Sequence, residues 1–248
     1  MKNVKIPHYL LILAFSSTAL NLLCGIFGIY FSIEGDLEMA LRLLIAGAFF
    51  DVLDGKFARR APIKSELGVY ADSFADLFTF ALLPSYMALN ADLFLGDIVV
   101  VSDITLIMLL AGLYSFAGWF RLVRFSQQPT GIMFEGLPSS AAAMFLGTMI
   151  LLTIQNSTIE ILNMITTGVL VFVSMMMVSK INYPSPKRMW KADNYLFASA
   201  SAIGFIFIII PNFLSLFIIL IIFMMYIFLG PIYYVKSEEI IAEGIAES

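Results

Sequence analysis

Long apolar runs separated by short polar segments recur along the whole chain of 248 residues. A run of about 20 apolar residues is long enough to cross the hydrocarbon core of a bilayer, which is roughly 30 Å thick. Such runs must be helical, because lipid offers no partner for an unpaired backbone amide or carbonyl. The pattern predicts about eight spanning helices, at residues 8–31, 37–59, 67–90, 99–120, 137–155, 159–180, 194–210 and 213–235. Between the last two, Pro211 and Asn212 fit either a tight turn between separate spans or a kink in one long segment.

Composition supports this interpretation. Hydrophobic residues make up 60% of the chain and charged residues 13%, whereas soluble domains carry about 25% charged residues. We therefore expect an all-α, polytopic integral membrane protein with one transmembrane domain, residues 1–236, and a short polar tail, residues 237–248. A single cysteine, Cys24, and a single histidine, His8, exclude internal disulfides and metal sites built from either residue type.

Positive charge is distributed unevenly between the predicted loops. If the chain has eight spans, every Lys and Arg residue except Arg42 falls on one side of the membrane. The positive-inside rule then places both termini at the cytoplasmic face of the cell membrane. The loops on the opposite side are acidic and contain Glu34, Asp36, Glu38, Asp92, Asp97, Asp103 and Glu160.

Four aspartates lie on a regular grid where the chain leaves the second predicted span and enters the third. The grid reads Asp51-x-x-Asp54-Gly55-x-x-Ala58-Arg59, eight further residues, then Gly68-x-x-x-Asp72-x-x-x-Asp76. Steps of three and four place each pair of aspartates on one face of its helix. Acids at membrane depth are costly, and four neighbouring carboxylates repel unless cations lie between them. The spacing therefore predicts an oxygen-rich site for two divalent cations at the cytoplasmic face.

The alternative is that these acids only pair with nearby basic residues, which explains neither the glycines nor the spacing. Those basic residues are Lys56, Arg59, Arg60 and Lys64. Arg60 and Lys64 fit a role as topology anchors better than a role as ligands.

The grid resembles, without departure, the D-x2-D-G-x2-A-R-x8-G-x3-D-x3-D signature of the CDP-alcohol phosphotransferases. The resemblance implies the fold of that family, two Mg²⁺ or Mn²⁺ ions, a CDP-activated lipid donor and a homodimer. It further implies that Asp51, Asp54 and Asp72 are metal ligands, and that Asp76 binds metal and is the catalytic general base. Such an ion pair can clamp a diphosphate, and phosphoryl transfer needs mainly positioning and charge compensation.

The donor is expected to contact residues around the grid. Small side chains at Gly55 and Ala58 would admit a nucleotide close to the backbone, although close helix packing would favour them equally. Arg59 suits a diphosphate oxygen, and Gly68 begins the third span, where backbone amides can meet phosphate. Asn21, in the first span, needs a polar partner and either approaches the donor head group or meets another polar residue. The expected donor contacts are Asp54, Gly55, Ala58, Arg59, Gly68 and Asn21.

Three further segments resemble the multi-span type of phosphatidylserine synthase within that family. They are Thr18-x-x-Asn21-Leu22-x-Cys24-Gly25 in the first span, Arg121-Leu-Val-Arg124-Phe125 followed by Phe134-Glu135-Gly136-Leu137-Pro138-Ser139-Ser140-Ala141-Ala142-Ala143 after the fourth, and Met177-Val178-Ser179-Lys180-Ile181-Asn182-Tyr183-Pro184-Ser185-Pro186-Lys187. Trp119-Phe120 and Ser140 depart from the usual pattern.

A serine acceptor needs a cation for its carboxylate, and Arg121 and Arg124 are the candidates. They could instead anchor the end of the fourth span. Ser139 is a further candidate for the acceptor site, or simply part of a helix start.

The sequence therefore predicts transfer of a phosphatidyl-type group from CDP-diacylglycerol or CDP-archaeol to L-serine, with no role for nucleic acid. The same chemistry with glycerol phosphate or inositol phosphate is one alternative. A divalent-cation transporter is another, since carboxylates inside a membrane also line ion paths. Acids of a transporter should continue toward the far side, whereas these stop near one end of their spans.

Overall fold

The computed structural model describes residues 8–60, 66–91, 93, 103–127, 133–184 and 213–246. Its elements are α1 (His8–Ile33), α2 (Leu37–Arg60), α3 (Glu66–Asp76), the π-helix η1 (Leu77–Leu82), α4 (Leu83–Leu89), α5 (Asp103–Gln127), β1 (Met133–Glu135), α6 (Ser139–Gln155), α7 (Glu160–Val178), β2 (Asn182–Pro184) and α10 (Phe213–Ala246). Some predicted features lie outside the described residues: the span at 194–210, Pro211, Asn212, and the charged residues Lys2, Lys5, Lys64, Asp92, Asp97, Lys187, Arg188 and Lys191.

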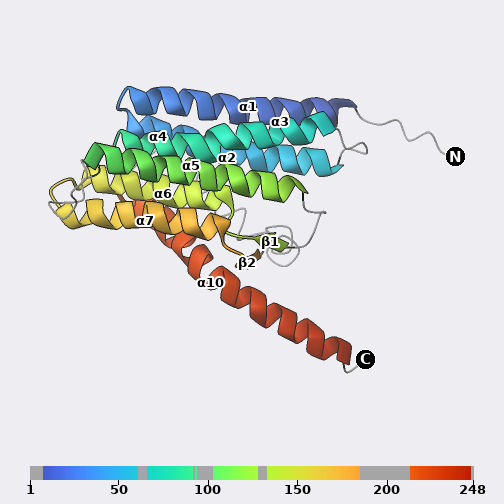
Figure 1. Ribbon diagram of the computed structural model, residues 1–248. Helices are drawn as coiled ribbons and strands as arrows, with labels where there is room; N and C mark the ends of the chain where they lie inside the picture. Colours follow the sequence, from blue (N-terminus) through green and yellow to red (C-terminus); the bar gives the residue numbers. More distant parts are fainter. Residues whose placement is uncertain are drawn as a thin grey trace.

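The helices from α1 to α7 lie side by side in an elongated bundle, and α10 crosses it at an angle (Figure 1). Among the described residues, four helical segments are long and apolar enough to cross a membrane: Tyr9–Ile33, Thr105–Arg124, Glu160–Val178 and Leu214–Ile232. The apolar helix Ser139–Gln155 is shorter. The prediction of a helical membrane protein is confirmed, while the total of eight spans stays a prediction.

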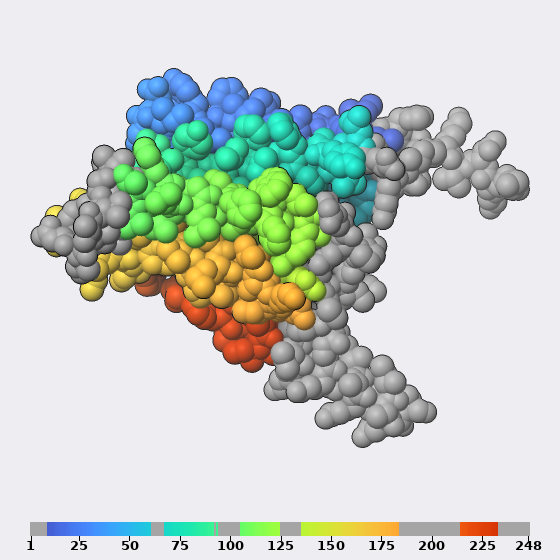
Figure 2. Space-filling view, viewed as in Figure 1, coloured from blue at the N-terminus to red at the C-terminus, as the bar shows by residue number. Residues whose placement is uncertain are grey.

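Helix α6 forms the centre of the bundle. Its small and apolar side chains are buried on every side, including Ala142, Ala143, Leu146 and Ile150, as expected of a helix that is apolar all round. The outer helices instead expose large apolar side chains, among them Phe27 on α1 and Leu109 on α5. On the face shown in Figure 2, the coloured helices pack closely against one another. An apolar exterior around a packed centre suits a lipid environment.

The predicted third span, residues 67–90, is divided into α3, η1 and α4. The π-helix begins directly after Asp76 and ends before Pro84, which lies near the start of α4. Single π-helical turns within α-helices are frequent at functional sites. The apolar pattern of residues 67–90 predicted one continuous helix and gave no sign of this π-helical segment.

The sequence predicted helices only, whereas the structure also contains a small antiparallel sheet. Strands β1 and β2 pair Phe134 with Tyr183 and Glu135 with Asn182. Arg124, on α5, ties this sheet to the bundle: its Nη2 atom donates to the carbonyl of Glu135, and its Nη1 atom donates to that of Val178 at 3.2 Å. Gly136 follows β1 with a φ of 80°, a conformation that side-chain-bearing residues rarely adopt.

Replacing Gly136 by alanine should therefore destabilise the protein. The added Cβ would lie 2.6 Å from the Nη2 atom of Arg124, and the positive φ alone costs about 1–3 kcal/mol. A lower midpoint of thermal unfolding in detergent is the expected result. Gly112→Ala is the matched control, because that helical glycine has open space around it. An unchanged midpoint for Gly136→Ala would mean that neither the positive φ nor the contact with Arg124 makes alanine unfavourable at this position.

Candidate metal centre

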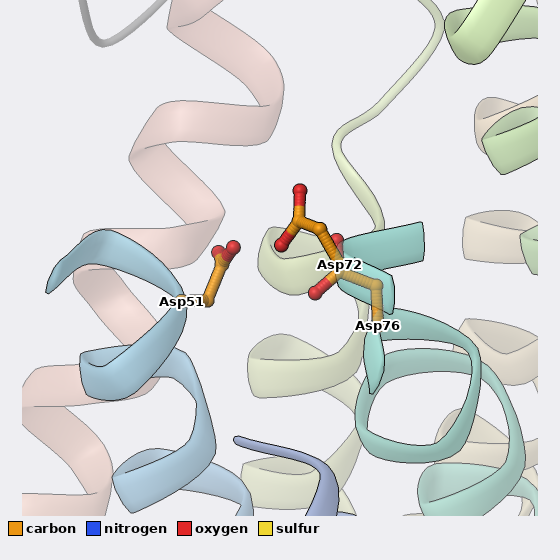
Figure 3. A group of neighbouring side chains, drawn as sticks. All are labelled: Asp51, Asp72 and Asp76. Carbon is orange, nitrogen blue, oxygen red and sulfur yellow. The ribbon is translucent and has the colours of Figure 1, made fainter. Parts of the chain in front are cut away.

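The aspartates of the grid come from two neighbouring helices, Asp51 and Asp54 from α2 and Asp72 and Asp76 from α3. One carboxylate oxygen from each of Asp51, Asp72 and Asp76 lies within 4.8 Å of the others. Figure 3 shows Asp51 facing the other two across the space between the helices. The structure therefore brings three of the four predicted ligands into one cluster.

This cluster fits a hard divalent cation. Carboxylate oxygens are the ligands such cations prefer, and the spacing lets several oxygens reach one ion. The Oδ1 atom of Asp72 is buried and has no hydrogen-bond partner among the described residues. A buried acceptor without a donor is costly unless another group satisfies it, and a bound cation would do so.

Asp54, the fourth predicted ligand, lies beside the cluster and outside its closest group. Its side chain is only 4% exposed and lies next to those of Asp72 and Asp51. The Oγ1 atom of Thr18 on α1 donates to Oδ2 of Asp54 at 3.1 Å. Thr18 belongs to one of the segments that resemble phosphatidylserine synthases, but the sequence did not predict its hydrogen bond to Asp54.

Asn21 lies on the inner side of α1 and is fully buried. Its Nδ2 atom donates to Oδ1 of Asp76 at 3.1 Å. Thr79, in η1, donates in turn to the backbone carbonyl of Asn21 at 2.9 Å. The sequence left open whether Asn21 meets the donor or another polar residue, and the structure places it against Asp76. Thr79 was missed because its approach depends on the π-helix.

The other residues expected to contact the donor lie where α2 ends and α3 begins. Ala58 and Arg59 are exposed, and Gly55 and Gly68 are partly exposed. A Cβ added at Gly55 would lie 3.1 Å from the Nη1 atom of Arg59, so this guanidinium passes over the glycine. An open face with a cation therefore adjoins the carboxylate cluster.

The three predicted acceptor residues take different positions. Arg121 is 6% exposed and its Nη1 atom donates to Oγ of Ser139 at 3.0 Å. It also lies within electrostatic range of Asp76, and of Tyr226 on α10. Arg124 is instead engaged with backbone carbonyls at the ends of β1 and α7. Tyr226 had no place in the sequence analysis, because its approach depends on how α10 crosses the bundle.

Among the residues that the structure describes, negative charge exceeds positive charge at this centre. The nearby cations that act on Asp51 are Arg121 and Arg59, against four carboxylates. Divalent cations would correct this imbalance, which agrees with the fit of the oxygen atoms.

Comparison with known proteins places this geometry in context. A protein from Bacillus subtilis (strain 168) named CDP-diacylglycerol–serine O-phosphatidyltransferase is 31% identical over 169 residues, which cover 68% of this chain and 87% of the relative. One of the same name from Methanocaldococcus jannaschii is 26% identical over 227 residues, 89% of this chain and 93% of the relative. The archaetidylserine synthase of Methanothermobacter thermautotrophicus is 30% identical over 170 residues, 66% of each chain.

A family model described as CDP-alcohol phosphatidyltransferase matches residues 11–178. The match extends from α1 to the end of α7 and so includes all four aspartates and the helix that contacts two of them. The resemblance seen in the sequence is thus confirmed, and the chain belongs to the CDP-alcohol phosphatidyltransferase family.

Proposed function

We propose that this protein transfers a phosphatidyl-type group from a CDP-lipid to the hydroxyl of L-serine and releases CMP. The observation that carries this proposal is the cluster of Asp51, Asp72 and Asp76, whose oxygens lie within 4.8 Å of one another at the positions of the family signature. Relatives named as serine transferases, in bacteria and in archaea, support serine as the acceptor.

Asp51, Asp54, Asp72 and Asp76 would hold the metal, which we propose to be two Mg²⁺ or Mn²⁺ ions. The chemistry that such cations supply when bound is neutralisation of charge on the diphosphate. Two observations support this assignment. The buried Oδ1 atom of Asp72 has no hydrogen-bond partner among the described residues, and carboxylates outnumber the basic side chains described around them.

Asp76 is the proposed general base. The serine Oγ attacks the phosphorus that carries the lipid and forms a new P–O bond. The bond from that phosphorus to the bridging oxygen of the diphosphate breaks, CMP leaves, and Asp76 accepts the hydroxyl proton. Asp76 suits this role because its carboxylate lies close enough to Arg121, a proposed acceptor residue, for their charges to interact.

Arg121 and Ser139 are the proposed acceptor site. A guanidinium binds a carboxylate well, and Arg121 lies near Asp76 while its position is fixed by Ser139. Serine bound there would have its carboxylate at Arg121 and its hydroxyl toward the base. Arg124 would contribute indirectly, by holding the chain between β1 and α6 that carries Ser139.

The donor would lie along the open face at the end of α2. Ala58 leaves room for the nucleotide, Gly55 leaves room for the guanidinium of Arg59 that would bind a diphosphate oxygen, and Gly68 would offer its backbone. The lipid chains, acyl or isoprenoid, would extend between helices into the bilayer.

The positive-inside pattern supports eight spans in the cell membrane, with the metal centre and both termini at the cytoplasmic face. A single catalytic domain over residues 1–236, a tail over 237–248 and a homodimer complete the proposal. In Figure 1 the start of α1 and the end of α10 lie toward the same end of the bundle, which agrees with this topology.

Release of CMP by the purified protein tests the function. With CDP-lipid and Mn²⁺ present, we expect turnover with L-serine to exceed that with glycerol phosphate or inositol phosphate by at least about 100-fold, because a site built for one polar acceptor leaves its groups unpaired with another. Activity with glycerol phosphate and none with serine would overturn the choice of acceptor.

A further inference from the structure

Helix α1 contacts one aspartate from each of the two helices that form the metal centre. Thr18 donates to Asp54 of α2 and Asn21 donates to Asp76 of α3, each at 3.1 Å. A separation of three residues places Thr18 and Asn21 on the same face of α1. The opposite face carries exposed apolar residues such as Phe27, so the polar pair lies on the side of α1 that faces the carboxylates.

Asn21 has little freedom to turn away from Asp76. Its backbone carbonyl accepts a hydrogen bond from Thr79 at 2.9 Å. A Cβ at Gly25 would lie 2.7 Å from the Oγ1 atom of Thr79, and one at Gly47 would lie 3.1 Å from Oδ1 of Asn21. These two glycines let α1, α2 and η1 approach until the amide of Asn21 is enclosed. Its NH₂ group faces an oxygen of Asp76, and an ionised carboxylate can only accept a hydrogen bond.

Thr18 holds Asp54 less firmly. Its hydroxyl lies 3.1 Å from Oδ2 of Asp54 and also 3.1 Å from the carbonyl oxygen of Ala14. A hydroxyl has one hydrogen, so the two acceptors share it. The Asn21 contact should therefore have the larger effect.

We propose that Thr18 and Asn21 are positioning residues, which orient Asp54 and Asp76 for the metal and for the acceptor hydroxyl. A carboxylate that accepts a hydrogen bond on one oxygen is restrained in rotation, so its remaining lone pairs point in a fixed direction. Residues that hold metal ligands in this way typically alter metal affinity or activity by about 10- to 100-fold when replaced. The inference rests on the proposed function for the role of the metal centre.

Binding of Mn²⁺ to the purified full-length protein, without CDP-lipid or serine, tests the inference. Electron paramagnetic resonance of free Mn²⁺ gives the dissociation constant. Asn21→Leu keeps the size of the side chain and removes the donor, and we expect it to weaken Mn²⁺ binding by about 10- to 100-fold. Thr18→Val should weaken it less. Thr148→Val is the control, because this buried hydroxyl donates to the Met144 carbonyl of its own helix.

A double-mutant comparison separates positioning from a general loss of structure. The effect of Asn21→Leu on Mn²⁺ affinity should disappear when Asp76 is already alanine and persist when Asp54 is alanine, because residues in direct contact are coupled and independent ones are additive. Thr18→Val should show the reverse dependence. If Asn21→Leu does not fold, Asn21→Ala replaces it.

Two results would overturn the inference. One is a folded Asn21 variant whose Mn²⁺ dissociation constant stays within about twofold of the wild type, well below the effect expected of a ligand-orienting residue. The other is an equal effect of Asn21→Leu in both aspartate backgrounds. A protein that binds Mn²⁺ as described but releases no CMP with serine would overturn the proposed function and leave this inference intact.

Discussion

Replacing Asp76 by asparagine should reduce serine-dependent CMP release by about 10²- to 10⁴-fold, the usual contribution of a general base. Asparagine has nearly the same shape and can still offer an oxygen, but it cannot accept the hydroxyl proton. Asp51 and Asp72 keep their carboxylates in this variant, so binding of Mn²⁺ and of the CDP-lipid should be weakened and not abolished. Single-turnover release of CMP, with separate titrations of metal and donor, distinguishes the two effects.

Asp36→Asn is the matched control for this change. Asp36 precedes α2 at its other end, where its Oδ1 atom accepts a hydrogen bond from the backbone amide of Met39 at 2.9 Å. Asparagine caps a helix about as well as aspartate, so this variant should retain full activity. Normal turnover by Asp76→Asn would remove Asp76 from the role of base.

Removing divalent cations should abolish the activity. With a chelator present, the three clustered carboxylates would face the diphosphate without charge compensation, and we expect CMP release to fall below about one hundredth of its original rate. Dialysis into Mg²⁺ or Mn²⁺ should restore it. Full activity in excess chelator would contradict a metal-dependent reaction.

Cation binding should also be visible without turnover. A ligand that binds only the folded protein raises its thermal stability, so Mn²⁺ should raise the unfolding midpoint of the wild-type protein. Asp51→Ala should show a smaller rise, because one of the three closest oxygens is lost. An equal rise in that variant would place the ion elsewhere.

Local sequence patterns predicted the long helices well. The predicted span 8–31 corresponds to α1 at His8–Ile33, and the span 37–59 to α2 at Leu37–Arg60. Apolar length accounts for α1, one of the four segments long and apolar enough to cross a membrane, because a helix in lipid needs about 20 apolar residues whatever its neighbours are. Helix α2 is less apolar, since its second half carries the aspartates and arginines of the grid. The π-helix η1 and the β1–β2 pair depend on contacts between distant segments, and the apolar pattern carries no signal for either.

The candidate site was predictable to a similar extent. Helical spacing placed each aspartate pair on one face, and in the structure three of the four carboxylates each bring one oxygen within 4.8 Å of the others. Spacing within one helix could not show that Asp54 would lie beside the closest group, nor that Arg124 would be occupied by backbone carbonyls. Thr18 and Asn21 did carry a signal, since both are polar residues within an apolar helix, but Ser16 and Ser17 beside them are polar as well. Only the packing of α1 against α2 and η1 identifies their partners.

The π-helical turn after Asp76 determines how α4 is rotated relative to α3, which carries Asp72 and Asp76. A π-turn holds more residues than an α-turn, and each residue of an α-helix advances the direction of its side chain by about 100°. Loss of one residue between 77 and 82 would rotate α4, with its buried Leu83 and Met87, relative to Asp72 and Asp76. The length of this segment therefore lets Asp72 and Asp76 face the metal centre while Leu83 and Met87 are buried in a different direction. After a single-residue deletion there, the protein could keep only one of these two arrangements.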